Sequence, residues 1–459
     1  MSFNKKILCI GAGYVGGSSM AIFARKCPEY KITVADINQE RIDAWNSDNL
    51  PIYEPGLYEI VKEVRGKNLF FTIDIAAGVK ESDIIFVCVN TPTKTFGAGA
   101  GKAADLQYIE KVARLILKHA DSDKIVVEKS TIPVKTAEAI SEILHSSGDK
   151  KVKFQIVSNP EFLSEGSAIN DMENPDRVLI GTEETPEGEK ARDEIIAIYS
   201  HWVQKDKIIT TSVWSSELSK LVANAFLAQR VSSINSISLL CEATGANALE
   251  VARAIGKDNR IGAKFLKPSP GFGGSCFKKD ILNLVYIAQS YNLNEVADYW
   301  ESVVLMNEYQ KDCFVKRMVR IMFNNITGKR IALFGFAFKS GTGDTRESAA
   351  IDIAKKLIEE KADLVITDPK ALANAKEDLA EYKGKVSFTA DPYQASCGAH
   401  AIAIVTGWEE YKNLDYKKIY ETMERPAFIF DGCNCLDSGA LYDIGFNVVP
   451  LGRGELVRW

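Results

Sequence analysis

Short apolar runs alternate with amphipathic stretches over the first two hundred residues of the chain. The segment 5–17 reads as a strand, a glycine-rich turn and a helix start, and the apolar run at 31–36 completes a β-strand–helix–β-strand unit of about 30 residues. Further strand-like runs lie at 83–89, 124–130 and 154–160, and a helical pattern lies between the first two of them, at 105–120. This alternation predicts an α/β fold, with a parallel, doubly wound sheet covered by helices on both faces.

The pattern changes near residue 212. Residues 215–245 contain no proline and no internal glycine, and they predict a long helix that ends at Gly245. A helix of this length suits a spine between two domains, with one face free to bury against another subunit. A second helical pattern covers 280–325, and from Gly328 the strand–loop–helix–strand–aspartate order of the first segment returns. We therefore predict two Rossmann-like domains, at 1–211 and 328–459. Between them we predict a helical middle domain for dimerisation, at 212–327.

Composition narrows the class of protein. A length of 459 residues fits about three domains, and a net charge of −5 with both signs spread along the chain argues against nucleic acid and against a membrane surface as partners. We find no apolar run long enough for a transmembrane helix, and we interpret the apolar N-terminal run as a core strand. Nine scattered cysteines favour reduced thiols in the cytoplasm, and the spacing of cysteines and of the four histidines predicts no metal site.

The first glycine motif predicts a dinucleotide site. Gly11, Gly13 and Gly16 form a GxGxxG between a strand and a helix, where glycine permits the tight turn, the approach of a pyrophosphate and the packing of helix on strand. Asp36 ends the next strand, and a carboxylate there accepts hydrogen bonds from a ribose 2′-OH and repels a 2′-phosphate. We therefore expect NAD as the cofactor. The alternative is an ordinary tight turn with a solvated aspartate.

The stretch GFGGSCFKKD, residues 271–280, predicts a reactive cysteine. Cys276 follows a glycine-rich turn and precedes two lysines, and nearby cations or a helix N-terminus favour a thiolate. Asp280 lies one helical turn further and could position a water molecule. A thiolate beside NAD suits oxidation of an aldehyde through a thioester that is then hydrolysed. The alternative is a small apolar side chain in a tight loop.

Other polar side chains carry weaker signals. Lys220 and Asn224 share one face of the long helix and could stabilise an oxyanion, although on spacing alone a surface lysine explains Lys220 better. Glu161 follows a strand end, where parallel sheets build their sites, but taken by itself it is better explained as a solvated turn carboxylate. Phe338 and Lys339 follow the first strand of the last domain, where the ring could stack on a base or belong to the core.

Ten motifs in one order give the chain a family resemblance. They are IGAGYVGG, LPIYEPGL, VNTPTKT, EKSTIPV, SNPEFLSEG, NPDRVLIG, WSSELSKLVANAFLAQR, GFGGSCFKKD, FGFAFK and GDTRES. Together they resemble the nucleotide-sugar 6-dehydrogenases of the UDP-glucose/GDP-mannose dehydrogenase family, in particular the UDP-glucose 6-dehydrogenases of eukaryotic type. The resemblance covers nearly the whole chain.

The resemblance implies a four-electron oxidation and a set of site residues. Two NAD molecules in succession would oxidise C6 of UDP-glucose to give UDP-glucuronate. Cys276 would form a thiohemiacetal and then a thioester, Lys220 and Asn224 would hold the C6 oxygen, and Asp280 would assist water or proton transfer. Glu161 would assist thioester hydrolysis. Thr131 would lie in a mobile loop near both ligands.

The same resemblance implies binding residues and assembly. The implied cofactor contacts are Gly11, Gly13, Tyr14, Val15, Gly16, Asp36, Arg41, Val89, Asn90, Thr91, Pro92, Thr93, Ser130, Glu165, Lys279 and Arg346. The implied substrate contacts are Phe162, Leu163, Arg260, Lys267, Phe272, Gly273, Phe277, Phe338 and Lys339, with Arg260 reaching a neighbouring subunit. The family forms dimers at least, animal relatives form hexamers, and some members are inhibited by UDP-xylose.

One departure from the family pattern keeps alternatives open. Cys433 stands where the family usually has an arginine that helps to bind the nucleotide sugar, and a thiol cannot make the bidentate hydrogen bonds of a guanidinium. An enzyme acting on GDP-mannose or on a UDP-N-acetylhexosamine therefore remains an alternative, as does a silent oligomer that senses NAD or a UDP-sugar. A one-step alcohol dehydrogenase with a histidine base fits poorly, because no histidine lies in any of the motifs.

Overall fold

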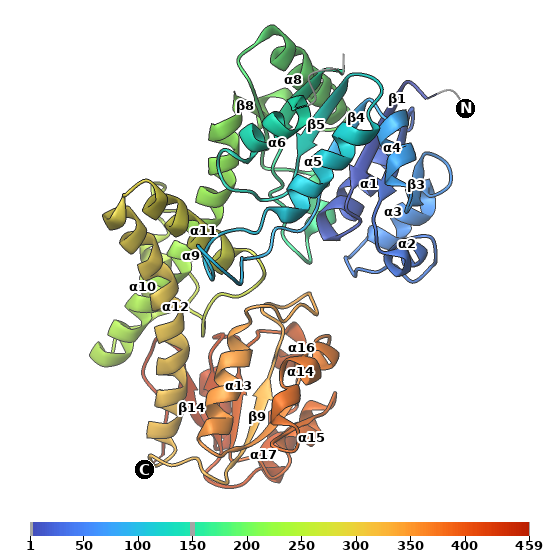
Figure 1. Ribbon diagram of the computed structural model, residues 1–459. Helices are drawn as coiled ribbons and strands as arrows, with labels where there is room; N and C mark the ends of the chain where they lie inside the picture. Colours follow the sequence, from blue (N-terminus) through green and yellow to red (C-terminus); the bar gives the residue numbers. More distant parts are fainter. Residues whose placement is uncertain (1–2, 147–151, 459) are drawn as a thin grey trace. The chain divides into compact units, whose positions relative to one another are not determined.

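Two central β-sheets organise the chain (Figure 1). The protein is represented by a computed structural model that describes residues 3–146 and 152–458. It divides into two units, Met1–Ala223 and Asn224–Trp459, each with its own sheet. The α/β class and the two Rossmann-like sheets that the sequence predicts are confirmed.

The sheet of the first unit has eight strands among the described residues, in the order β3-β2-β1-β4-β5-β6-β7-β8. Their bounds are Lys5–Ile10 (β1), Tyr30–Ala35 (β2), Leu69–Thr72 (β3), Ile84–Val87 (β4), Lys124–Glu128 (β5), Phe154–Ser158 (β6), Val178–Thr182 (β7) and Ile208–Ser212 (β8). The strands from β3 to β6 are parallel, but β7 pairs antiparallel with β6 and parallel with β8. The strands that the sequence predicts are therefore parallel, as expected. The antiparallel strand β7 was not among them, and it returns beside β6 through the loop and short helix that follow β6.

Helices cover both faces of this sheet. Residues alternate along β1, so that Ile7 and Cys9 join one core cluster while Leu8 and Ile10 join the other. One face is covered by α1 (Tyr14–Lys26), α3 (Leu57–Val64), α7 (Ala168–Glu173) and α8 (Pro186–Tyr199), and the other by α4 (Ile75–Glu81), α5 (Gln107–His119) and α6 (Thr136–His145). The short helix α2 (Gln39–Trp45) follows β2. These layers place the carboxyl ends of β1, β4, β5 and β6 along one edge.

The helical region confirms one sequence prediction and corrects another. The helix α9 runs from Val213 to Thr244, and Gly245 follows it with a φ of 79°, a left-handed conformation that favours glycine at a helix end. The helical pattern predicted over 280–325 is two helices, α11 (Phe277–Ser290) and α12 (Asn294–Ile321). The break between them contains Asn292, which has a φ of 58°. The short helix α10 (Ala248–Ile255) lies between α9 and the Cys276 loop in the sequence.

The second sheet resembles the first but has fewer strands among the described residues. Its strands are all parallel, in the order β11-β10-β9-β12-β13-β14. The bounds are Arg330–Phe334 (β9), Asp363–Thr367 (β10), Val386–Phe388 (β11), Ala401–Ile404 (β12), Phe428–Asp431 (β13) and Asn447–Pro450 (β14). The helices among them are α13 (Ala349–Glu359), α14 (Leu372–Asp378), α15 (Pro392–Ser396), α16 (Glu409–Lys412), α17 (Tyr416–Thr422) and α18 (Ser438–Ile444).

The internal repeat extends to hydrogen bonds at the first turn of each sheet. Gly11 follows β1 with a φ of 110°, and Gly335 follows β9 with a φ of 91°. After each turn a backbone N–H donates to the aspartate that ends the next strand: Ala12 to Asp36 over 2.8 Å, and Phe336 to Asp368 over 2.7 Å. The strand–loop–helix repeat predicted from Gly328 onward is therefore present in the fold.

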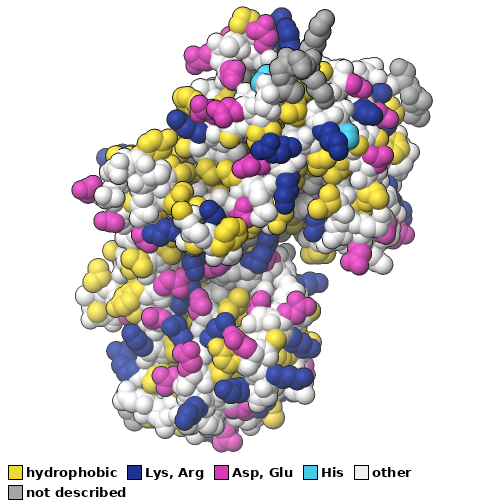
Figure 2. Space-filling view, in the orientation of Figure 1, with side chains coloured by type: hydrophobic (Ala, Val, Ile, Leu, Met, Phe, Trp, Pro, Cys, Tyr) yellow, Lys and Arg dark blue, Asp and Glu magenta, His cyan; other side chains and the backbone are white. Residues whose placement is uncertain are grey.

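The exposed surface is of mixed charge on the face shown in Figure 2, where basic and acidic side chains are interspersed with hydrophobic ones. Among the described residues, no helix is long and apolar enough to cross a membrane. All nine cysteines lie in the described part of the chain and are free thiols.

Candidate active site

The glycine motif forms the turn between β1 and α1. A Cβ on Gly16 would meet the Gly11 carbonyl oxygen at 2.0 Å, so only glycine lets the helix pack this closely on the turn. A Cβ on Gly13 would meet no protein atom within 4 Å, so packing does not require glycine there. Gly13 is the N-cap of α1 and gives it no side-chain cap. The open backbone and the helix N-terminus together fit a pyrophosphate, which needs close approach and free N–H groups.

Asp36 is fixed beside this turn. Its Oδ2 accepts the Ala12 N–H over 2.8 Å and lies 3.1 Å from a guanidinium nitrogen of Arg41. Its Oδ1 accepts the N–H of Asn38 over 3.0 Å. The structure therefore brings together Asp36 and Arg41, two residues that the family resemblance assigns to the cofactor.

Two loops that follow β4 and β5 are joined by side-chain hydrogen bonds. The Ser130 hydroxyl donates to the Val89 carbonyl over 2.7 Å, and the Thr91 hydroxyl donates to the Thr131 carbonyl over 2.8 Å. Both loops lie at the carboxyl edge of the sheet, where open α/β sheets bind their ligands. The remaining predicted contacts of the first loop are its neighbours Asn90, Pro92 and Thr93, and Val15 lies in the first turn of α1.

Tyr14 holds a third loop through a residue that the sequence reasoning did not single out. The Tyr14 hydroxyl donates to the carboxylate of Glu54, which also accepts the N–H groups of Gly166 over 2.8 Å and Ala168 over 2.6 Å. Burial, together with Glu54, raises the pKa of the Tyr14 hydroxyl. Glu54 thus fixes the loop that carries the predicted cofactor contact Glu165.

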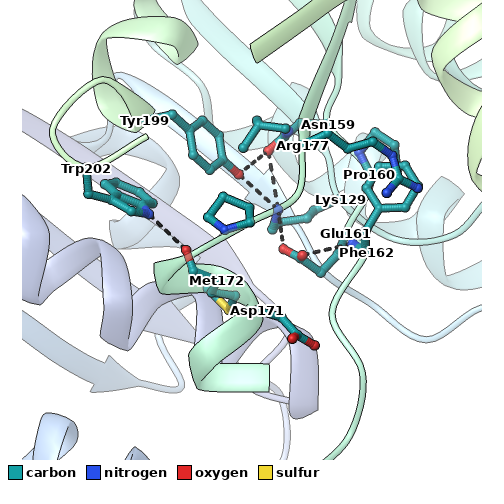
Figure 3. Close-up of a pocket in the computed structure, with 12 residues that line it drawn as sticks. Lys129, Asn159, Pro160, Glu161, Phe162, Asp171, Met172, Arg177, Tyr199 and Trp202 are labelled. Carbon is teal, nitrogen blue, oxygen red and sulfur yellow. Dashed lines mark hydrogen bonds and ion pairs between the residues drawn. The ribbon is translucent and has the colours of Figure 1, made fainter. Parts of the chain in front are cut away.

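Glu161 lies in a small polar pocket after β6 (Figure 3). Its Oε1 accepts the N–H groups of Phe162 over 2.8 Å and Leu163 over 3.2 Å, and its Oε2 lies 2.8 Å from the ammonium of Lys129. Burial raises the pKa of Glu161, but the Lys129 charge and these hydrogen bonds outweigh it and leave the pKa below its usual range. Glu161 is therefore an anchored carboxylate and not the solvated turn residue of the alternative interpretation.

Two cations flank the ring of Phe162. The ammonium of Lys220 lies 5.1 Å from the ring centroid, and the guanidinium carbon of Arg177 lies 3.8 Å from it. Lys220 is 7% exposed, and its positive charge lowers the pKa of Glu161. Lys220 is therefore a buried lysine whose charge acts on Glu161, and its burial removes the surface-lysine interpretation.

Cys276 is the exposed N-cap residue of α11. The N–H of Asp280 donates to the Cys276 carbonyl over 2.8 Å, which confirms that the two residues lie one helical turn apart. Asp280 is 1% exposed; its Oδ2 accepts from Asn224 over 2.6 Å, and the Lys279 ammonium lies 3.3 Å from its Oδ1. The carboxylate and the amide thus form a buried pair in the second unit, one helical turn from the residue that carries the thiol.

The lysine next to the thiol has carboxylate partners of its own. Lys278 lies 3.0 Å from Glu347 and 3.5 Å from Glu308, and burial lowers its pKa less than these two carboxylates raise it. Its charge is therefore shared with two carboxylates. The helix N-terminus at Cys276 is the second source of positive potential that the sequence argument invoked.

The glycine-rich turn before Cys276 is closely packed. A Cβ on Gly273 would meet the Glu347 carbonyl oxygen at 2.4 Å, and the N–H of Gly274 donates to the Arg346 carbonyl over 2.8 Å. The ring of Phe272 meets Phe277 edge to face with centroids 5.8 Å apart. Phe338 packs over Gly274, with the Lys339 ammonium 5.6 Å from its ring centroid. The structure thus gathers five of the predicted substrate contacts around the Cys276 turn.

Three cations that were predicted to bind a ligand, Arg346, Arg260 and Lys267, also belong to the second unit. The Arg346 guanidinium binds Asp344, and the exposed Arg260 guanidinium binds Asp258 of its own loop over 2.7 Å. Lys267 acts on the Cys433 region: burial raises the pKa of the Cys433 thiol, Asp431 and Cys435 raise it further, and only Lys267 opposes them. Lys267 is therefore a cation whose charge acts on Cys433, at the position where the family usually has an arginine.

Comparison with known proteins identifies the family. Models of the UDP-glucose/GDP-mannose dehydrogenase family match residues 5–203 (NAD binding domain), 214–309 (central domain) and 332–438 (UDP binding domain). These models cover more than half of the chain. The chain belongs to the UDP-glucose/GDP-mannose dehydrogenase family, and its cofactor is NAD.

Curated relatives and a solved structure agree with this assignment. The chain is 57% identical to UDP-glucose 6-dehydrogenase 5 of Oryza sativa subsp. japonica, over 98% of this chain and 97% of the relative. It is 55% identical to UDP-glucose 6-dehydrogenase of Drosophila melanogaster, over 98% and 96%. A UDP-glucose dehydrogenase structure from Pyrobaculum islandicum superposes with a TM-score of 0.84 at 28% identity, covering 97% of this chain and 98% of that one.

The sequence reasoning missed two charged residues at the site, Glu54 and Lys129. Glu54 and Lys129 lie in motifs that carried the resemblance, LPIYEPGL and EKSTIPV. The sequence offered one signal for Lys129, which is its place directly after an apolar strand. A lysine at such a position can be buried when a carboxylate pairs with it. Among the described residues there is no cluster of three or more side chains suited to hold a metal ion.

Proposed function

We propose that the chain is a UDP-glucose 6-dehydrogenase that oxidises C6 of UDP-glucose to the carboxylate of UDP-glucuronate, with two molecules of NAD used in succession. The observation that carries this proposal is the exposed Cys276 at the start of α11, one turn from the buried Asp280–Asn224 pair. Relatives 55% and 57% identical over almost the whole chain, both named UDP-glucose 6-dehydrogenase, support the substrate.

The chemistry of Cys276 follows from the level of oxidation. The first oxidation yields an aldehyde, and addition of the Cys276 thiolate to its carbonyl carbon gives a thiohemiacetal. Loss of a second hydride turns this adduct into a thioester, and bound NAD supplies the hydride acceptor in each oxidation. Water then cleaves the thioester, and Cys276 is regenerated. The thiol holds the aldehyde on the protein between the two oxidations.

The other proposed catalytic side chains are each given one role in this chemistry. Lys220 and Asn224 lie one turn apart on α9 and stabilise the C6 oxygen as negative charge develops on it. Asp280, held by Asn224, positions water or a proton. Glu161 assists hydrolysis as an anchored carboxylate, and Thr131 contributes from the loop after β5.

Ligand binding is proposed for the two sheets separately. The glycine turn, Asp36 with Arg41, and the joined loops after β4 and β5 bind NAD, and Glu165, Lys279 and Arg346 add contacts. The turn around Phe272, Gly273 and Phe277, with Phe338, Lys339, Arg260 and Lys267, binds the UDP-sugar, together with Phe162 and Leu163. The match of residues 332–438 to the family's UDP binding domain supports a uridine nucleotide.

Domain boundaries, assembly and location are further parts of the proposal. Three domains at 1–211, 212–327 and 328–459 are supported by the limits of the three family models. Exposed apolar side chains on α9 and α12, among them Phe226, Leu240, Tyr299 and Leu305, support a homodimer at least. Nine free thiols support the cytoplasm.

A substrate panel tests the function. Purified protein with NAD is given UDP-glucose, GDP-mannose or UDP-N-acetylmannosamine, and NADH formation is followed. The alternatives matter because Cys433 replaces the usual arginine, and because a UDP-D-ManNAc dehydrogenase of Pyrococcus horikoshii shares the fold at a TM-score of 0.81. We expect UDP-glucose to be oxidised at the lowest concentration. We expect Cys276→Ser to abolish steady turnover, and Cys397→Ser, at another exposed cysteine, to retain it.

A further inference from the structure

Lys129 is a buried lysine that forms an ion pair with Glu161 (Figure 3). Its side chain is 1% exposed, and it follows β5 at the carboxyl edge of the sheet. The ammonium lies 2.8 Å from Glu161 Oε2, 3.1 Å from the Tyr199 hydroxyl and 3.3 Å from Asn159 Oδ1. All three directions in which an ammonium donates are therefore taken by oxygen acceptors.

The partners of Lys129 are themselves fixed by the fold. The Tyr199 hydroxyl, on α8, donates to Asn159 Oδ1 over 2.7 Å. The Asn159 amide donates to the Leu179 carbonyl of β7 over 2.8 Å. Because α8, β7 and the end of β6 all contribute, the ammonium cannot move without breaking several buried hydrogen bonds.

We propose that Lys129 is a positioning residue for the hydrolytic step: its ammonium keeps Glu161 ionised and pointed in one direction, with Tyr199 and Asn159 as its support. This inference rests on the proposed function, because it concerns hydrolysis of the Cys276 thioester. In that step water adds to the thioester carbonyl carbon and the C–S bond breaks. One proton of the water is accepted by Glu161 and passes to solvent, and the other goes to the departing Cys276 sulfur, so that the sugar leaves as a carboxylate and the thiol is regenerated.

The buried setting explains why Glu161 needs a fixed cation. Burial by itself favours the neutral acid. A neutral Glu161 cannot take a proton from water, and it accepts a hydrogen bond from water more weakly than the carboxylate does. Lys129 is the strongest of the charges that oppose this effect, and Lys220 is a weaker one. The other ionisable groups that face the pocket are Asp171, Arg177 and Tyr199.

A buried ion pair is weak evidence for a role in stability, since apolar replacement of both partners is often neutral. A structural role predicts that Lys129→Met lowers stability and leaves the pH profile of the reaction unchanged. A positioning role predicts a defect confined to hydrolysis, with a changed pH profile. The two roles are therefore separable by kinetics.

The test compares wild type, Lys129→Met, Glu161→Gln and the double variant, with UDP-glucose and NAD. We expect Lys129→Met to form two NADH per active site in a rapid burst and then turn over about 10–100-fold more slowly. The intact-protein mass should show the sugar held on Cys276, and the slow rate should recover as pH rises. In the Glu161→Gln background, Lys129→Met should change the rate less than about twofold, because it acts through Glu161.

Lys124→Met is the matched control. Lys124 is also buried, at the start of the same strand, but its ammonium donates to the backbone carbonyl of Ser82 over 2.6 Å. We expect no accumulation of the covalent adduct in this variant. If Lys129→Met does not fold, Tyr199→Phe replaces it, and slower hydrolysis with the same pH shift supports the inference.

Three results would overturn it: an unchanged pH profile, no covalent adduct in the Lys129 variant or its replacement, or an equal loss of rate in the Glu161→Gln background. Failure of the proposed function looks different. In that case the wild-type enzyme itself would not form two NADH per UDP-glucose, whatever the variants did.

Discussion

The amide of Asn224 donates to Oδ2 of Asp280 over 2.6 Å, and both side chains are buried. Asn224 lies on α9 and Asp280 in the first turn of α11, so this hydrogen bond ties the long helix to the helix that begins after Cys276. With Lys279 beside the other oxygen, Asp280 has a donor at each carboxylate oxygen. The pair is the fixed part of the centre around the thiol.

Removal of the amide should impair turnover more than binding. Asn224→Ala leaves the buried Asp280 carboxylate without one donor, a loss of about 1–3 kcal/mol. We expect kcat to fall about 10–100-fold, with KM for UDP-glucose changed less than about threefold. Asn294→Ala, an exposed asparagine at the start of α12, serves as the control. A kcat within twofold of wild type in Asn224→Ala would show that Asp280 does not depend on this contact.

Asp36 should set the choice between the two nicotinamide dinucleotides. Its carboxylate, fixed by Ala12 and Arg41, excludes a 2′-phosphate by charge. We expect Asp36→Ala to lower the ratio of kcat/KM for NAD to that for NADP by about 10–100-fold, because Arg41 is then free to meet the phosphate. Asp43→Ala, on the exposed side of α2, should leave the ratio unchanged. If Asp36→Ala kept the wild-type preference for NAD over NADP, the adenosine ribose would not bind at Asp36.

Lys267 should carry the role of the arginine that Cys433 replaces. Its charge acts on the Cys433 and Cys435 thiols, so the cation lies close to that position. We expect Lys267→Met to raise KM for UDP-glucose about 10-fold or more while KM for NAD stays within about twofold. Lys264→Met, three residues away and exposed, is the matched control. Equal KM values in the two variants would contradict this assignment.

Much of this arrangement follows from sequence, and the exceptions have physical reasons. The strands at 5–10 and 124–128 and the long helix from Val213 are apparent from their hydrophobic periods. The strands β3 and β8 are short and half exposed, so their patterns resemble loops. The antiparallel β7 is not predicted by periodicity, because the period of a strand is the same in both directions.

The contacts between polar side chains could not be predicted from the sequence, for a different reason. Lys129 and Glu161, like Asn224 and Asp280, are far apart in the sequence, and only the fold brings each pair together. A lone lysine or carboxylate in a sequence is more often solvated. The resemblance supplied Glu161, Asn224 and Asp280, whereas Lys129 became apparent only through its contacts.

Glu128 and Glu217 form a buried carboxyl pair that should make stability depend on pH. Glu217 accepts the N–H groups of Lys135 and Ala137 at the start of α6, and both oxygens of Glu128 are buried beside it. Burial and the partner carboxylate raise the pKa of Glu128, and burial raises the pKa of Glu217 to about 7. One proton shared between the two satisfies both groups.

The sign of the effect follows from these raised pKa values. The folded protein keeps a proton that the unfolded chain loses near its ordinary glutamate pKa of about 4.3, so the stabilisation is complete below that pH and is lost as pH rises through about 7. We expect the free energy of unfolding to fall by about 1–3 kcal/mol over this window, and Glu217→Gln to make the fall smaller, while the buried Glu128 still contributes to it. Urea unfolding at several pH values measures it. Glu138→Gln, at an exposed glutamate of α6, should retain the full dependence; an identical pH profile in Glu217→Gln and wild type would contradict the pairing.

The central claim is that Cys276 holds the aldehyde between two oxidations. The most direct measurement mixes limiting UDP-glucose with excess NAD and counts the NADH formed per sugar consumed. The account predicts two NADH per UDP-glucose, with UDP-glucuronate as the product. One NADH per sugar, with free aldehyde released, would contradict the covalent role of Cys276.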